Sequence, residues 1–166
     1  MRHSIGRTRN GMLVYVDLIN SKAGIHIAQQ PYLLGLLKQA LAGISAKGVS
    51  MSIEHDMGRS VGYNFVVKTT EKDTVLYARL LRDELYTRFV KNGKPLATTF
   101  ISMVLERDTD KNYELRDAWI GRLTPPRPGS DQETVDSKQY WAEHAYVLDN
   151  QSLQLRTVTK TCPYEA

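Results

Sequence analysis

The sequence predicts an α+β fold: a mostly antiparallel sheet built from repeated β-β-α units, with two main helices and one short helix packed on one face. Apolar residues recur at every second position in some short segments and at every third or fourth position in others, which are the periods of strands and helices. The strand-like segments come in pairs that begin near residues 12, 49, 96 and 145. Helix-like segments follow the first three pairs, which is the order expected for helices covering an antiparallel sheet.

The first unit consists of strands over 12–19 and 24–28 and a helix after Pro31. The segment 12–19 is rich in β-branched and apolar residues, and 24–28 follows a short polar connection. Proline is tolerated in the first helical turn, and Gly48 ends the helical pattern. Four apolar residues recur within it at helical spacing: Leu33, Leu37, Leu41 and Ile44.

The second unit is predicted to contain a hairpin of strands 49–56 and 63–67, followed by a helix over 70–92. Apolar and polar residues alternate in both strand segments, with a glycine-containing turn between them. Gly93 and Pro95 provide the stop signal for the helix. An apolar stripe runs along this helix: Val75, Ala78, Leu81, Leu85 and Phe89.

The remaining elements are a central strand over 96–105, its partner strand over 113–123 and a short helix over 137–144. Apolar residues occupy both alternations of 96–105, as in a strand covered on both faces. The proline-rich segment 124–130 disfavours helix and sheet, so it is predicted to be an extended loop. Two final strands follow, over 146–149 and 153–159.

The length and composition predict a single domain over 11–166. A basic segment over 1–10 precedes it and is compatible with a flexible conformation. The chain has 166 residues, 42% hydrophobic and 24% charged, which are ordinary globular values. No apolar run approaches the roughly 18 residues of a membrane helix, and the first residues lack the apolar core of a signal peptide. The single cysteine, Cys162, forms no internal disulfide. These features predict a cytoplasmic protein without membrane contact.

A formal net charge of +4 and a pI near 9.2 favour anionic partners. Lysine and arginine are spread along the chain, apart from the N-terminal cluster of Arg2, Arg7 and Arg9. No Walker loop, dinucleotide-binding glycine pattern or metal-ligand spacing is present, so no metal site is predicted and the cofactor is left unknown. Arg79, Arg82 and Tyr86 share the exposed side of the predicted helix 70–92, where they either read a phosphate backbone or form a solvated face.

The first candidate site surrounds His55. If Met51 and Ile53 face the core, His55 faces it too, while Glu54 and Asp56 share the opposite face. Two interpretations remain open. His55 is either an acid or base beside an anion held by Arg59, or a core histidine next to a charged turn.

The second candidate site surrounds Asp117, which alternation places on the same side as Tyr113, Leu115 and Trp119. A buried carboxylate needs an Arg, Lys, His or ligand as partner. Asp117 therefore belongs either to a ligand site with Trp119 and Arg122 or to a structural ion pair.

The third candidate site is the helix that carries Tyr140, Trp141 and His144. Tyr140 and His144 lie four residues apart, so they share one helical face. These aromatic groups either stack on a base or sugar, with Arg122 or Arg127 on its phosphate, or anchor the helix on the sheet.

The leading hypothesis is a small cytosolic protein that binds, and if it is an enzyme hydrolyses, a nucleotide-like or other phosphate-bearing ligand, either a small molecule or a short nucleic acid. The candidate catalytic residues are His55, Asp117 and His144. The candidate ligand-binding residues are Arg59, Trp119, Arg122, Arg127 and Tyr140. The alternative is a non-enzymatic protein-interaction module or homo-oligomeric assembly module.

Overall fold

A computed structural model describes residues 2–80, 83–109, 111–148 and 155–164, which form three helices and twelve strands in mostly antiparallel sheets. The predicted α+β class is confirmed. The chain divides into two compact units, Met1–Tyr63 with Ala97–Leu123, and Asn64–Leu96 with Thr124–Ala166. The single domain over 11–166 stays a prediction, because compactness alone does not decide whether two units unfold together. Among the described residues, no helix has the length and apolar character needed to cross a membrane.

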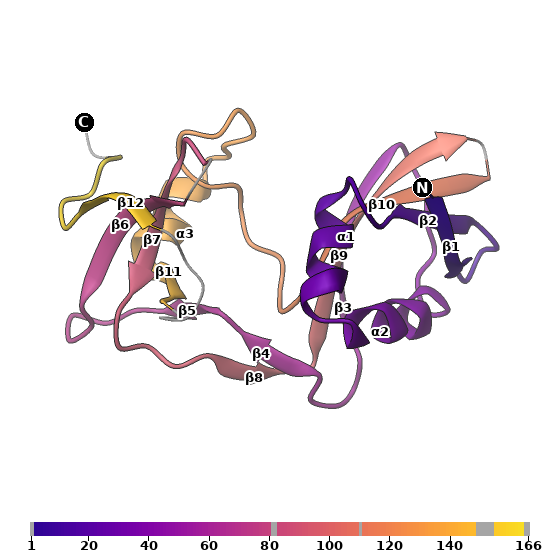
Figure 1. The fold of residues 1–166 in the computed structure, drawn as a ribbon, viewed down its shortest axis with the longest axis horizontal. Helices are drawn as coiled ribbons and strands as arrows, with labels where there is room; N and C mark the ends of the chain where they lie inside the picture. The colour runs from indigo at the N-terminus through magenta and orange to yellow at the C-terminus, as the bar shows by residue number, and fades with distance from the viewer. Residues whose placement is uncertain (1, 81–82, 110, 149–154, 165–166) are drawn as a thin grey trace. The chain divides into compact units, whose positions relative to one another are not determined.

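The first unit is built on a five-stranded sheet in which only β2 and β10 run parallel (Figure 1). The strand order is β1-β2-β10-β9-β3, with bounds Arg2–Arg7, Leu13–Asp17, Asn112–Ile120, Phe100–Thr109 and Ser50–Asp56. The predicted strands over 12–19, 49–56 and 113–123 are thus confirmed as β2, β3 and β10. Most of the basic segment 1–10 forms β1, which pairs with β2.

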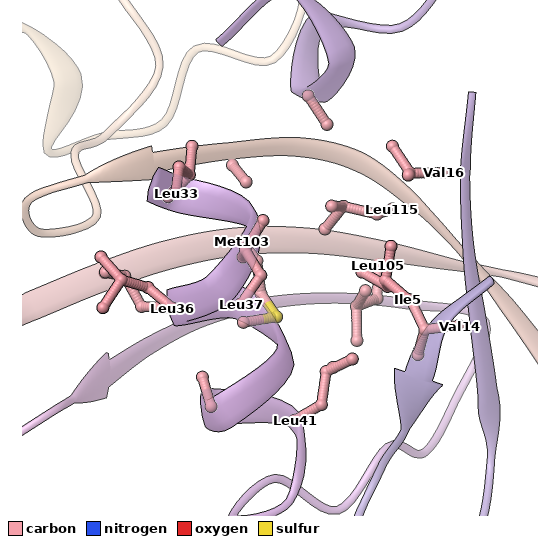
Figure 2. Packing of buried hydrophobic residues seen from close by; sticks show 14 of the residues in the cluster. Ile5, Val14, Val16, Leu33, Leu36, Leu37, Leu41, Met103, Leu105 and Leu115 are labelled. Carbon is pink, nitrogen blue, oxygen red and sulfur yellow. The ribbon is translucent and has the colours of Figure 1, made fainter. Parts of the chain in front are cut away.

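The main core lies between this sheet and two helices, α1 (Lys22–Gln29) and α2 (Tyr32–Leu41). α2 confirms the predicted first helix, and Leu33, Leu37 and Leu41 along its stripe are fully buried. Figure 2 shows these leucines beside buried residues of the central strands, including Met103 and Leu115. The helical spacing of the leucines therefore gives α2 its buried side.

The prediction of a strand over 24–28 is wrong, because this segment lies in α1. Ser21 caps the helix, with its Oγ accepting a hydrogen bond of 2.9 Å from the Gly24 amide. A Cβ at Gly24 would lie only 2.4 Å from the carbonyl oxygen of Leu18, so the missing side chain lets α1 pack directly on the end of β2. Ala23, Gly24 and Ile27 are buried at helical spacing, although the local alternation resembles a strand.

The predicted hairpin between 49–56 and 63–67 is also wrong. β3 pairs with β9, and residues 63–67 are divided between two short strands, β4 (Gly62–Asn64) and β5 (Val66–Lys68). β4 pairs with β8 (Leu96–Thr98), and β5 with the strand His144–Val147. Long-range pairing has overridden the local turn signal. The predicted pairing of 96–105 with 113–123 is confirmed in β9 and β10.

The second unit has its own five-stranded sheet, in the order β12-β6-β7-β11-β5. The bounds of β12, β6, β7 and β11 are Leu155–Thr159, Val75–Leu80, Tyr86–Val90 and His144–Val147. α3 (Ser137–Glu143) confirms the predicted short helix, and β11 and β12 confirm the last two strands except at 149 and 153–154, which lie outside the described residues. Two small apolar clusters form this unit's core, one around Val90 and one around Phe89.

The prediction of a helix over 70–92 is wrong: the segment contains the antiparallel strands β6 and β7. Of the predicted helical stripe, Ala78 and Phe89 are buried, and with Leu76 on β6 and Thr87 on β7 they fall at every second position of the two strands. Leu81 of the stripe lies outside the described residues. Asp83 lies between the two strands, where its side chain accepts a hydrogen bond of 3.0 Å from the Leu85 amide. Without this helix, and with α1 in place of a strand, the repeat of β-β-α units is not confirmed.

Candidate functional site

The eight predicted site residues fall into two groups. The first unit contains His55, Arg59, Asp117, Trp119 and Arg122. The second unit contains Arg127, Tyr140 and His144. Each group has its own set of partners.

Asp117 lies at a β-bulge that changes which side of β10 it occupies. Leu115 pairs with Leu105 and Asp117 with Val104, so Arg116 is an extra residue in the ladder. The buried residues of β10 are Tyr113, Leu115, Ala118 and Ile120. Beyond the bulge, alternation therefore places Asp117 on the side opposite the core, and its predicted place on the side of Tyr113 is wrong.

The partner that Asp117 was expected to need is His26 of α1. Its Nδ1 lies 2.9 Å from Asp117 Oδ1, which also accepts a 2.8 Å hydrogen bond from the Ala118 amide. The side-chain hydrogen bond with Asp117 raises the pKa of His26, against an opposing effect of burial and of the nearby Lys22 charge. The two side chains are 38% and 23% exposed, so this ion pair joins α1 to β10 at the margin of the core.

Sequence reasoning missed His26 because its segment was predicted to be a strand. The available signal was the short polar connection that ends in Ser21, a preferred N-cap residue. A helix beginning there places His26 beside the buried positions Ala23 and Ile27. That placement makes it a neighbour of the sheet.

We expect stability to depend on pH through the His26–Asp117 pair. Because the pKa of His26 is raised on folding, its contribution is fully present below the ordinary value of 6.5 and is lost as the pH rises through the folded-state pKa. Urea unfolding at a series of pH values measures this decline. Asp117→Asn should flatten it, and an unchanged slope in that variant would contradict the assignment.

Trp119 and Arg122 meet at the end of β10, where a carboxylate neutralises the arginine. Arg122 Nη2 lies 2.6 Å from Glu54 Oε1, and the guanidinium covers the Phe100 ring at 4.2 Å. The hydrogen bond from Arg122 is the main cause that lowers the pKa of Glu54. Trp119 Nε1 donates to the Arg122 carbonyl oxygen at 3.1 Å. A phosphate at Arg122 would therefore compete with Glu54.

His55 lies on the core side of β3, beside Gly43, where an added Cβ would be 3.1 Å from His55 Cε1. Met51 and Ile53 pack against the core, as the alternation predicts. Arg59 donates a 2.8 Å hydrogen bond to Gln39 Oε1. Within the described part of the chain, no hydrogen bond or ion pair joins His55, Arg59 and Asp117 to one another.

The aromatic residues of α3 pack on one another and on β11. The rings of Tyr140 and His144 are stacked at 3.9 Å, and His144 Nδ1 lies 2.9 Å from the Tyr140 carbonyl oxygen. Trp141 is 3% exposed, stacks on Tyr146 at 5.4 Å, and donates from Nε1 to the Pro125 carbonyl oxygen at 3.0 Å. This geometry favours the helix-anchoring interpretation, because Tyr140 and His144 leave no gap between their rings for a base.

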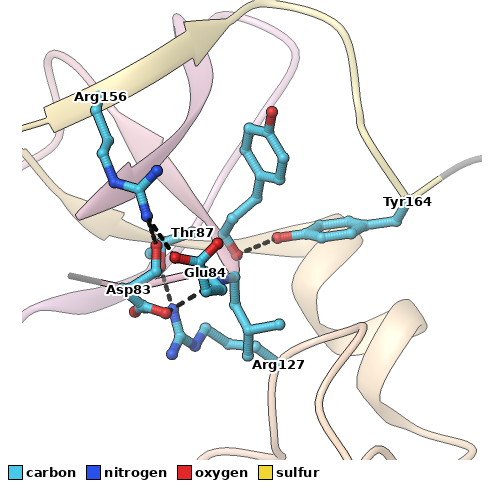
Figure 3. A network of polar contacts seen from close by, with 8 residues as sticks. Asp83, Glu84, Thr87, Arg127, Arg156 and Tyr164 are labelled. Carbon is cyan, nitrogen blue, oxygen red and sulfur yellow. Dashed lines mark hydrogen bonds and ion pairs between the residues drawn. The ribbon is translucent and has the colours of Figure 1, made fainter. Parts of the chain in front are cut away.

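Arg127, from the proline-rich segment, is also paired with a carboxylate. Its Nη1 lies 2.8 Å from Asp83 Oδ2 and 2.6 Å from Thr87 Oγ1 (Figure 3). Asp83 belongs to the connection between β6 and β7, and Thr87 belongs to β7. Arg127 thus holds the proline-rich segment to this part of the second unit.

Three further arginines lie on one face of the second sheet, which we call the arginine face: Arg79, Arg88 and Arg156. Arg79 of β6 is directly opposite Tyr86 of β7 and Arg156 of β12, and Arg88 is opposite Tyr77. Residues paired across neighbouring strands share a face of the sheet. The sequence signal is the Tyr-x-Arg spacing in both β6 and β7, which the helix prediction obscured.

Two of these arginines keep an uncompensated charge. Arg88 donates to neutral oxygens only: Tyr77 Oη at 3.3 Å, Thr69 Oγ1 at 2.9 Å and the His144 carbonyl at 3.2 Å. Arg79 Nε is buried without a hydrogen-bond partner, and its guanidinium lies 4.4 Å from the Tyr86 ring centroid. Among the described residues, no carboxylate forms an ion pair with either side chain.

Arg156 differs, because it donates to the Asp83 carbonyl oxygen at 2.7 Å and to Glu84 Oε1 at 3.2 Å. The Glu84 side chain is 87% exposed, so solvent screens this pair strongly. The arginine face as a whole is therefore rich in positive charge and poor in fixed counter-charge.

No group of three His, Cys, Asp or Glu side chains in the described ranges lies close enough to hold a metal ion. On the arginine face, Arg156 is the one arginine that forms an ion pair with a carboxylate among the described residues. Comparison with protein-family models, with curated proteins and with solved structures finds no match to this chain.

Proposed function

We propose that the protein binds a phosphate-bearing ligand, a nucleotide-like small molecule or a short nucleic acid, at the arginine face. The observation that carries this proposal is that Arg79 and Arg88 have no carboxylate partner among the described residues. In addition, Arg79 Nε is buried without a hydrogen-bond partner. A buried donor without an acceptor costs about 1–3 kcal/mol. A phosphate at the guanidinium groups would supply the counter-charge that these two arginines lack, since the planar guanidinium matches phosphate geometry.

The arginines that the sequence first suggested are less suited to this role. Arg122 is paired with Glu54 and Arg127 with Asp83, so a phosphate would have to displace a carboxylate at either position. Arg59 donates to a neutral partner, Gln39, and belongs to the first unit, whereas the arginine face belongs to the second. Arg79 and Arg88 need no such displacement.

The contacts of His144 support ligand binding without a catalytic step. His144 is the candidate catalytic residue of this unit, and its carbonyl oxygen already accepts a hydrogen bond from Arg88. Its ring is stacked on Tyr140 and its Nδ1 is close to the Tyr140 carbonyl. A general base requires a ring nitrogen directed at the substrate or at water.

We expect inorganic phosphate, pyrophosphate, ATP or a short single-stranded oligonucleotide to raise the thermal stability of the protein, with the strongest effect from one of the four. A ligand at 100 times its dissociation constant stabilises by about 2.7 kcal/mol. Arg88→Gln should weaken the binding of that probe about tenfold or more, as measured by titration calorimetry, because a hydrogen bond to a charged group contributes about 1.5–3 kcal/mol.

Arg59→Gln is the matched control, since it removes one arginine charge from the first unit and leaves the arginine face intact. Circular dichroism establishes that both variants are folded. Equal weakening by the two substitutions would indicate a general charge effect and contradict the proposed site. Absence of a shift with all four probes would contradict the proposed function itself.

A further inference from the structure

The C-terminal part of the described chain contributes directly to the arginine face. β12 is an edge strand of the second sheet, and residues 160–164 follow it. We call residues 155–164 the C-terminal strap. Its Arg156 is directly opposite Arg79 of β6, and like charges in opposed positions of a sheet destabilise the pairing.

The strap is also strained at one backbone position. Thr157 has φ of 54°, the left-handed region that a β-branched residue rarely adopts. It lies between the paired residues Arg156 and Thr159, where the register of β12 against β6 shifts. Strain at such a residue persists only where the surroundings compensate for it.

Tyr164 holds the far end of the strap against β7 (Figure 3). Its hydroxyl donates to the Tyr86 carbonyl oxygen at 2.5 Å, and its ring packs edge-on against Tyr77 with centroids 5.9 Å apart. Burial raises the pKa of Tyr164 to about 12, so the hydroxyl remains a donor at neutral pH. Tyr77 and Tyr86 are the residues opposite Arg88 and Arg79, so the strap contacts the arginine face at both ends.

We propose that a phosphate group binds between the guanidinium groups of Arg79 and Arg156 and locks the C-terminal strap onto the sheet. This inference rests on the proposed function and adds a specific site and a structural consequence. An anion between the two groups replaces a repulsion with two attractions. Arg156 can release Glu84 at small cost while keeping its hydrogen bond to the Asp83 carbonyl oxygen, because the Glu84 side chain is largely exposed to solvent.

Binding and strap docking are then thermodynamically linked. A ligand that prefers the docked strap strengthens docking, and docking strengthens ligand binding by the same factor. Arg88 adds charge to the site but belongs to β7, so its removal weakens binding without separating the ligand from the strap. Arg156 and Arg88 therefore have different expected effects.

Hydrogen exchange of the strap amides, with and without saturating inorganic phosphate or pyrophosphate, tests the inference. We expect either anion to slow exchange over residues 157–164 about fivefold or more, the lower end of typical coupling factors. Arg156→Gln should abolish this slowing at saturating anion, whereas Arg88→Gln should retain it. Tyr164→Phe, which removes the hydroxyl that donates to Tyr86, should speed strap exchange in the absence of anion.

Two results would overturn the inference in different ways. Anion binding that depends on Arg88 but leaves strap exchange unchanged would remove the inference and leave the proposed function standing. Failure of phosphate, pyrophosphate, ATP and oligonucleotide alike to bind would remove both. Thr157→Gly relieves the backbone strain and leaves every arginine in place. Phosphate should still slow hydrogen exchange of the strap in this variant, and loss of the slowing would also contradict the inference.

Discussion

Replacing Trp141 with alanine is expected to lower the free energy of unfolding of the second unit by about 3–5 kcal/mol. The indole is 3% exposed, stacks on Tyr146 and donates a hydrogen bond to the Pro125 carbonyl oxygen. Among the described residues, the two apolar clusters of this unit contain four and three buried residues, so little fully buried packing compensates for the lost indole. Urea unfolding followed by circular dichroism, together with hydrogen exchange in β6 and β7, measures the loss.

Tyr140→Ala is the appropriate control, because it removes a neighbouring aromatic ring that is less buried than Trp141. We expect it to cost clearly less stability. If Trp141→Ala instead left the unit stable and abolished ligand binding, Trp141 would be part of a stacking surface and the helix-anchoring interpretation would be wrong. The two variants therefore separate the two roles that the sequence left open for this helix.

The elements predicted correctly are those in which local pattern and tertiary environment agree. The leucine stripe of α2 is buried as its spacing indicates, and the apolar segment that became β9 lies in the interior of its sheet. In residues 70–92 the same apolar stripe fits a helix and two strands, and only pairing with β11 and β12 decides between them. That pairing joins residues far apart in the sequence, so local periodicity carries no information about it.

The candidate sites show the same division between local and long-range information. The chemistry of a carboxylate predicts that Asp117 needs a partner, and in the structure that partner is His26. The bulge at Arg116 could not be predicted in this way, because it depends on the register of β10 with β9. The arginine face exists only because β6, β7 and β12 are neighbours. The sequence spacing predicted that Arg79 and Tyr86 share one side of a helix. In the structure they are paired across two neighbouring strands instead.

Leu37→Ala is expected to lower the free energy of unfolding of the first unit by about 2–5 kcal/mol, since the side chain is fully buried in the main core. Hydrogen exchange through global unfolding should accelerate in β9 and β10 by about 30-fold or more. Ile25→Ala, at a position 52% exposed on α1, should change exchange little. An unchanged rate in Leu37→Ala would contradict the packing role assigned to α2.

The same Leu37→Ala experiment decides whether the chain is one domain. Leu37 belongs to the main core cluster of the first unit, while the apolar clusters around Val90 and Phe89 belong to the second. In a single cooperative domain, amides in β6 and β7 that exchange only through global unfolding accelerate by the same factor as those in β9 and β10. If the amides of β6 and β7 keep their wild-type exchange rates, the two units unfold independently and the single-domain prediction is wrong. The stability of the second unit, which carries the arginine face, and its response to phosphate can then be measured separately from the stability of the first unit.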